Sequence, residues 1–132
     1  MTDPAKLKFT ETHEWVRVQG DRLRVGVSDF AQQKLSDIIH VDLPEPDDHH
    51  YEAGEEMCVL ESLKTAADVH APLSGIIVAI NSSLLSKPEL VNSDPYGDGW
   101  LVEMHADHAD DVNGLADYDE YEASLPEEEE EP

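Results

Sequence analysis

Three short strand-like segments placed close together constrain the fold more than any other feature of this chain. Residues 57–60 and 66–71 are separated only by a segment, 62–65, whose composition suits a tight type I turn. A proline-containing corner at residues 71–75 then leads into residues 76–80, a β-branched run that suits a buried strand. Strands this short and this closely spaced predict a barrel or flattened sandwich rather than a parallel sheet.

The preceding segments carry further strand and helix signals. Residues 9–18 have extended character, and after a turn residues 22–27 alternate polar and apolar side chains, so a hairpin is expected here. Ser28 is a suitable N-cap for a short helix that ends near Ser36. Residues 38–43 return to strand spacing.

The remaining segments are less regular. Residues 47–52 are polar and predict a loop, and residues 81–85 predict one short helix. A final strand is expected over residues 100–104. In residues 107–125 the apolar side chains recur at helical spacing, and Gly114 is expected to break this region into two helices.

The length of 132 residues fits one domain. We assign residues 1–125 to this domain and residues 126–132 to an acidic tail that is expected to be disordered, because its five consecutive glutamates cannot pack. No apolar run is long enough to span a membrane, no secretory signal is visible at the N-terminus, and a single cysteine, Cys58, cannot form an internal disulfide. These features predict a soluble, monomeric, cytoplasmic protein.

The charge balance is strongly acidic, with 31 Asp and Glu against eight Lys and Arg and a net charge of −23. Such a field repels nucleic acid and anionic membranes, so neither is expected as a partner. One interpretation is a solvated surface that keeps a small protein soluble. The other is adaptation to a salt-rich cytoplasm, in which ions screen the repulsion.

Basic residues are scarce, and Lys64 is the only one between Lys34 and Lys87. At the tip of a tight hairpin its ε-amine projects from a rigid support and is accessible to an acylating enzyme. An amide there would remove the charge and extend the side chain into a flexible arm that visits partner active sites. From spacing alone, an ordinary exposed turn lysine remains the alternative.

Several segments occur in an order and spacing typical of one protein family; they are residues 12–16 (Thr-His-Glu-Trp-Val), 29–37, 41–44 (Val-Asp-Leu-Pro), 61–69 (Glu-Ser-Leu-Lys-Thr-Ala-Ala-Asp-Val), 71–75, 88–92 and 94–100. Through these segments, and so over most of its length, the chain resembles the glycine cleavage system H protein family. The chain departs from the family's pattern at Leu63, where valine is usual, at Thr65, where alanine is frequent, and in the loop after Pro44.

The resemblance implies a mainly β fold with short α-helices, a hybrid barrel-sandwich of the lipoyl- and biotinyl-carrier type with flanking helices. It implies that Lys64 carries lipoate in amide linkage and that the protein is a carrier rather than an enzyme. The implied partners are a pyridoxal-phosphate glycine decarboxylase, a tetrahydrofolate-dependent aminomethyltransferase and dihydrolipoamide dehydrogenase. A lipoate ligase or octanoyl transferase would attach the cofactor.

The family fold also implies neighbours for the arm. Thr12, Glu14 and Asp68 match positions near it, and we expect them to line a shallow pocket that shields the aminomethyl amine; Asp68 is alternatively one more solvated acid. Glu61 is a further candidate neighbour. It serves either recognition by the lipoylating enzyme or, as a strand-edge acid, the prevention of edge pairing.

Other readings of the sequence stay open. A relative with the same fold could relay lipoyl groups to other complexes or serve sulfur oxidation, and an interaction protein could have kept the fold without the cofactor. A biotin carrier lacks support, because Leu63 and Thr65 replace the expected methionines beside the lysine. The histidines lack a zinc pattern, so no metal is expected, and Cys58, Trp15 and Trp100 are expected in the core.

Overall fold

The computed structural model describes residues 3–46 and 49–125. The strands of these residues are β1 (Lys8–Phe9), β2 (Glu14–Gln19), β3 (Arg22–Val27), β4 (Ile38–Asp42), β5 (His50–Tyr51), β6 (Glu56–Ser62), β7 (Ala66–His70), β8 (Gly75–Ile80) and β9 (Val102–Ala106). The helices are the 3-10 helices η1 (Pro4–Lys6) and η2 (Ala109–Gly114) and the α-helices α1 (Asp29–Leu35), α2 (Ser83–Ser86), α3 (Leu90–Ser93) and α4 (Tyr118–Ser124). The prediction of a mainly β chain with short helices is confirmed.

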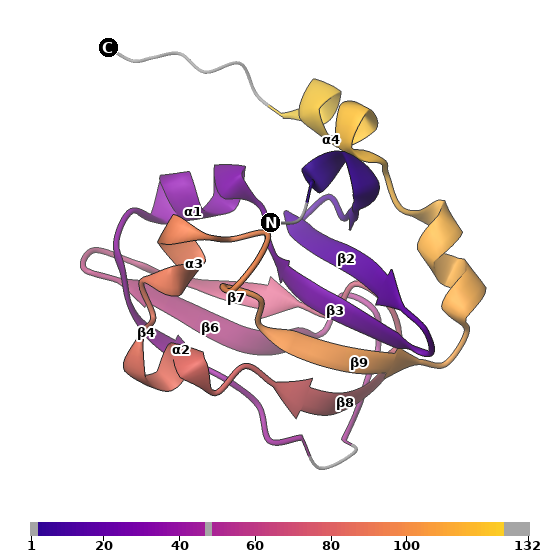
Figure 1. The fold of residues 1–132 in the computed structure, drawn as a ribbon, viewed down its shortest axis with the longest axis horizontal. Helices are drawn as coiled ribbons and strands as arrows, with labels where there is room; N and C mark the ends of the chain where they lie inside the picture. The colour runs from indigo at the N-terminus through magenta and orange to yellow at the C-terminus, as the bar shows by residue number, and fades with distance from the viewer. Residues whose placement is uncertain (1–2, 47–48, 126–132) are drawn as a thin grey trace.

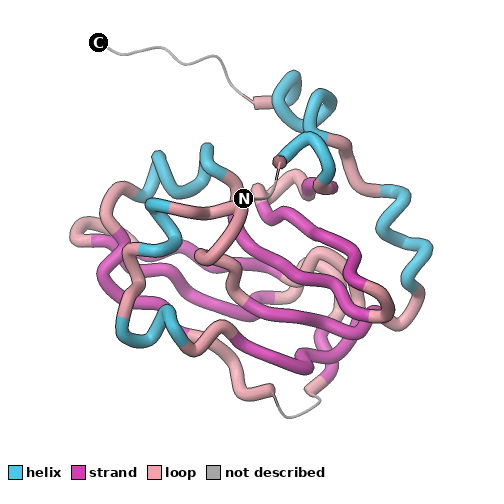
Figure 2. Tube along the Cα trace, viewed as in Figure 1, coloured by secondary structure: helices cyan, strands magenta, loops and turns pink. Residues whose placement is uncertain are grey.

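The strands form two antiparallel sheets. The larger has the order β1-β2-β3-β9-β8-β5 and the smaller the order β4-β6-β7. Figure 1 shows α1, α2 and α3 together at the end of the molecule where the loop between β6 and β7 lies, whereas α4 lies beside η1. In Figure 2 the strands occupy the middle and the helical segments the periphery, so the helices flank a β core.

The core is built from apolar side chains of both sheets. Val25 and Met104 of the larger sheet and Val41, Leu60 and Val69 of the smaller one belong to the same buried cluster. Burying such side chains stabilises the fold by roughly 1.5–3 kcal/mol each, so packing between the sheets holds the two layers together.

A second buried cluster fixes the C-terminal helix. Phe9 and Trp15 pack with Tyr121 of α4, and the ring of Phe9 stacks on that of Tyr121 with centroids 4.5 Å apart. The indole N–H of Trp15 donates to the carbonyl of Pro95 at 2.9 Å, which confirms its predicted core position. Trp100 differs from the prediction: it is only half-buried, and the Arg24 guanidinium lies over its ring at 4.3 Å.

Helix α1 begins and ends where the sequence predicts. The Ser28 hydroxyl accepts a hydrogen bond from the backbone N–H of Ala31, which satisfies one of the free donors of the first turn. Ser36 ends the helix with a φ of 66°, a left-handed conformation that a continuing helix cannot contain. Asp29 lies in the first turn and Lys34 in the last, the arrangement that the helix dipole favours.

Residues 9–18 are not one continuous extended segment. β1 and β2 are separated by a turn in which the Thr10 hydroxyl oxygen accepts from the backbone N–H groups of Thr12 and Glu14. His13 has a φ of 78° in this turn. The prediction was wrong here because the turn is made by a threonine side chain and contains no glycine, proline or asparagine to signal it.

Smaller differences occur in the irregular regions. The predicted loop over 47–52 contains β5, whose Tyr51 pairs with Gly75 of β8. The last strand begins at Val102 rather than at residue 100, because the N–H of Trp100 bonds back to the carbonyl of Gly97 within the preceding turn.

The helical predictions were right in part. The helix expected over 81–85 runs from Ser83 to Ser86, and α3 and η1 had not been predicted. Residues 107–125 do form two helices, although the first is a 3-10 helix. The predicted disordered tail, 126–132, lies outside the described residues, and no helix in the described part of the chain is both long and apolar enough to cross a bilayer.

Candidate functional site

Lys64 lies at the tip of the β6–β7 hairpin, as the sequence predicts. The backbone N–H of Ser62 donates to the carbonyl of Thr65 at 2.8 Å, and the N–H of Thr65 donates to the Ser62 hydroxyl at 3.3 Å. Lys64 is exposed and Leu63 is 77% exposed; neither has a positive φ, so the mirror-image turn types are excluded. The hairpin therefore presents the lysine on a closed, hydrogen-bonded turn.

A hollow of about 290 Å³ lies between this turn and the C-terminal end of α1. We call it the tip hollow; it is lined by Lys34, Leu35, Ser36, Asp37, Ser62, Leu63, Lys64 and Thr65. Lys64 is thus not isolated in space, because Lys34 of α1 shares its hollow.

A second hollow of about 350 Å³ lies along α1, against Phe30, Ala31, Lys34 and Leu35. We call it the Glu14 hollow; it is lined by Thr12, His13, Glu14, Val27, Phe30, Ala31, Lys34, Leu35, Leu60, Ala67, Asp68 and Val69. The structure therefore brings Thr12, Glu14 and Asp68 to one cavity. Lys34 and Leu35 line both hollows, so the tip hollow and the Glu14 hollow are neighbours.

Glu61 lies apart from these three residues. It pairs with His40 of β4 on one side and Ala66 of β7 on the other, is exposed, and lines neither hollow. β6 is the middle strand of its sheet. The interpretation of Glu61 as a strand-edge acid was therefore wrong.

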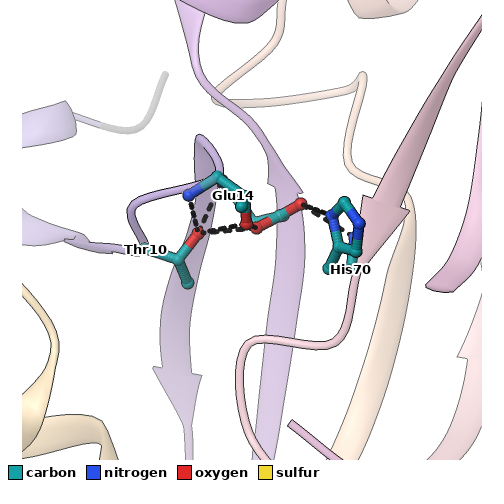
Figure 3. Close-up of polar contacts among 4 residues, drawn as sticks. Thr10, Glu14 and His70 are labelled. Atoms are coloured by element: carbon teal, nitrogen blue, oxygen red, sulfur yellow. Dashed lines mark hydrogen bonds and ion pairs between the residues drawn. The ribbon is translucent and has the colours of Figure 1, made fainter. Parts of the chain in front are cut away.

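Glu14 is a buried carboxylate with ordered partners (Figure 3). Its side chain is 1% exposed, and its Oε1 atom accepts from the hydroxyls of Thr10, at 2.6 Å, and Thr12. Its Oε2 atom accepts from the backbone N–H of His70 at 2.8 Å, with the His70 Nδ1 atom 3.4 Å away. Charge-assisted hydrogen bonds of this kind offset the cost of burying a carboxylate.

Sequence reasoning missed two of these partners. Thr10 had a weak signal, since Thr10, Thr12 and Glu14 recur at every second position. His70 had none, because it reaches Glu14 only through the packing of β7 against the turn before β2. Sequence reasoning also did not assign His13 to the site. This residue lines the Glu14 hollow, and burial lowers the pKa of its imidazole below the ordinary value.

The remaining candidate groups are the cysteine and the possible metal ligands. Cys58 is 2% exposed, and burial raises the pKa of its thiol to about 12, which fits the predicted core role rather than that of a nucleophile. Within residues 3–46 and 49–125, no three His, Cys, Asp or Glu side chains come together in a way that could hold a metal ion.

Comparison with known proteins identifies the family. A family model described as "Glycine cleavage H-protein" matches residues 7–128. The chain belongs to this family. It is 50% identical over 126 residues to the glycine cleavage system H protein of Alteromonas mediterranea, with 95% of this chain and 97% of the relative covered. It is 45% identical over 125 residues to that of Acinetobacter baylyi, with 95% and 100% covered.

A solved structure shares the fold. The crystal structure of a glycine cleavage system H protein from Mycobacterium marinum superposes with a TM-score of 0.82 at 34% identity, covering 92% of this chain and 97% of that one. The predicted barrel-sandwich with flanking helices is confirmed, and so is the predicted family. Membership supports a role in the glycine cleavage system.

Proposed function

We propose that Lys64 carries lipoate in amide linkage and that the protein is a carrier which acts as a tethered substrate. The observation that carries this proposal is the exposed lysine on a closed turn in the tip hollow, which shares Lys34 and Leu35 with the hollow of the buried Glu14 carboxylate. A bound lipoyl group would supply a disulfide that opens when one sulfur takes up a one-carbon unit and the other becomes a thiol, and removal of that unit would leave a dithiol.

The residues present fit such a group. Lys34 and Leu35 line both the tip hollow and the Glu14 hollow, and Val27, Leu60 and Val69 give the second hollow apolar surface for a hydrocarbon chain. Glu14 and Asp68 add two carboxylates for a basic amine. An arm that extended from Lys64 into the Glu14 hollow would thus contact both apolar surface and carboxylates.

The function supported best is shuttling of the aminomethyl group of glycine from the pyridoxal-phosphate decarboxylase to the tetrahydrofolate-dependent aminomethyltransferase. Glu14 is proposed to keep the amine protonated, because a protonated amine has no lone pair with which to expel the neighbouring sulfur. Thr12 orients the Glu14 carboxylate through its hydroxyl, and Asp68 adds a second negative charge at the rim. These residues would hold the group until a partner removes it.

Other proteins must supply the remaining steps. Dihydrolipoamide dehydrogenase is proposed to restore the disulfide, and a lipoate ligase or octanoyl transferase to acylate Lys64. The exposed Glu61 lies only three residues before the lysine, which supports a contact with the acylating enzyme.

The test is the intact mass of the natively produced protein, with fragmentation around Lys64. We expect a lipoyl adduct on Lys64, its loss in Lys64→Arg, and its retention in Lys87→Arg, a matched change at the next lysine along the chain. Glycine decarboxylation with the cognate enzymes should fail only in the first variant.

Each alternative predicts a different result. A bare Lys64 in native material would favour an interaction protein without a cofactor, and a biotin adduct would indicate a biotin carrier. A lipoylated protein that does not support glycine decarboxylation would point to a lipoyl relay for other complexes.

A further inference from the structure

The two walls of the Glu14 hollow are joined by one hydroxyl from the distant C-terminal helix. His13, in the turn that forms the first wall, places its Nδ1 atom 2.7 Å from the hydroxyl of Tyr121 in α4. The same hydroxyl lies 2.7 Å from the Oγ atom of Ser28, the N-cap of α1, which forms the second wall. Tyr121 thus bridges the turn and the helix.

The first wall contains a strained residue. His13 has a φ of 78°, in the left-handed region that residues other than glycine seldom adopt, and such strain persists only where the surroundings hold it. Here its carbonyl accepts from the N–H of Ser28 at 2.9 Å, and its N–H donates to the carbonyl of Thr10 at 3.2 Å. The side-chain bond to Tyr121 adds a third restraint.

The bridging hydroxyl is held firmly. The Tyr121 side chain is 3% exposed and its ring stacks on Phe9. A capping box between Asp117 and Glu120 starts the helix that carries it. The short helix α4 therefore holds one buried phenol against His13 and Ser28, which belong to the two walls of the hollow.

Three neutral groups make up the bridge. Burial raises the pKa of Tyr121 to about 12 and lowers that of His13, so the phenol is protonated and the imidazole uncharged near neutral pH. Ser28 Oγ already accepts from Ala31 N–H. The Ser28 hydroxyl therefore donates to the Tyr121 oxygen, and the Tyr121 hydroxyl donates to His13 Nδ1, because the opposite order would leave the Ser28 proton without an acceptor in the bridge.

We propose that Tyr121 is a positioning residue for the carried aminomethyl group: its hydroxyl fixes the Thr12–Glu14 turn against α1 and so sets the geometry in which the Glu14 carboxylate meets the amine. This inference rests on the proposed function. It assigns to the C-terminal helix a part in protecting the cargo, although Tyr121 does not line the Glu14 hollow itself.

The test compares Tyr121→Phe with wild type as lipoylated full-length proteins. Each is loaded by the decarboxylase from glycine labelled at its methylene carbon, because the carboxyl carbon leaves as carbon dioxide, and loss of label is followed without folate or aminomethyltransferase. We expect the lifetime of the loaded form to fall about five- to tenfold, the equivalent of one or two lost hydrogen bonds. The rate of lipoylation should not change, because the phenol does not line the tip hollow.

The matched control is Tyr118→Phe, which removes a phenol from the same helix. The Tyr118 ring also packs on Phe9, and its hydroxyl bonds to Glu122 within α4 rather than to a wall of the Glu14 hollow. The loaded form of Tyr118→Phe should have the same lifetime as that of the wild-type protein. His13→Asn, which removes the other end of the bridge with a residue that tolerates positive φ, should reproduce the Tyr121→Phe effect.

A spectroscopic readout separates positioning from general loss of stability. The imidazole nitrogen shifts of His13 should move in Tyr121→Phe and stay unchanged in Tyr118→Phe. Equal lifetimes for wild type, Tyr121→Phe and His13→Asn would overturn the inference and leave the proposed function standing. A wild-type protein that cannot be loaded at Lys64 would overturn both.

Discussion

Replacing Glu14 with glutamine removes the buried charge while keeping the shape of the side chain. The new amide has one acceptor where the carboxylate had two. The Thr12 hydroxyl can rotate and accept from the amide nitrogen, the Thr10 hydroxyl already accepts from two backbone N–H groups and so loses its acceptor, and the backbone N–H of His70 can only donate. We therefore expect the amide oxygen to face His70 and the fold to survive.

Two magnitudes follow from this geometry. Weaker hydrogen bonds lower the free energy of unfolding, but the relief of a buried charge offsets part of the loss, so the net destabilisation should be about 1–2 kcal/mol. An amine 4 Å from the carboxylate interacts by about 4 kcal/mol at an effective dielectric constant near 20. If desolvation cancels half of this, the lifetime of the loaded form should fall about 30-fold.

The assay is the release of label from the loaded, lipoylated protein, together with urea unfolding of the same sample. Glu11→Gln is the matched control, because Glu11 is an exposed residue of the same turn and its replacement changes the net charge equally. The reasoning is refuted if Glu14→Gln keeps the wild-type lifetime, or if Glu11→Gln shortens it as much.

Three further predictions concern stability. The hydrogen bond that His50 donates to the Asp107 carboxylate raises the pKa of His50, so this pair stabilises the fold below about pH 6.5 and its contribution is lost as pH rises through the folded-state pKa. Asp107→Asn should therefore flatten the pH dependence of the thermal midpoint over that window. Gly75→Ala should cost about 2 kcal/mol or more in urea unfolding, because a Cβ there would lie 2.8 Å from the Ala106 Cα and closer to the His105 carbonyl. Molar potassium chloride should raise the thermal midpoint by screening the net charge of −23, and no rise would contradict the salt-adaptation hypothesis.

The β6–β7 hairpin could be predicted from sequence because everything that forms it is local. Its strands are consecutive, the turn between them accepts most residue types, and Ser62 and Thr65 close it through their own backbone and side-chain groups. The helix after Ser28 was predictable for the same reason, since a cap and an apolar face lie within one short segment.

The Glu14 hollow could not be derived in this way. Glu14 begins β2, His70 ends β7, and their contact depends on how two sheets pack. The resemblance to a family placed Thr12, Glu14 and Asp68 near one another, but it did not identify Thr10, His13 or His70. The role of each residue toward the arm stays a prediction that the variants above address.

Helix α1 shows why the hollow depends on residues far from the lysine. A seven-residue helix is too short to be stable by itself, so other segments must hold it. At its N-terminal end Tyr121 bonds to the cap Ser28. At its C-terminal end the Asn92 amide nitrogen donates to the Gln32 side chain and to the carbonyl of Ser36, while its oxygen accepts from the N–H of Ile38 in β4.

These two anchors come from α4 and α3, whereas Lys64 lies on the β6–β7 hairpin. Because Lys34 and Leu35 of α1 line both hollows, any shift of the helix changes the tip hollow and the Glu14 hollow together. An exposed turn suffices to display a lysine for acylation. On the proposed function, retaining the aminomethyl group would require a wall of fixed position, which would account for the helices that both halves of the chain contribute around α1.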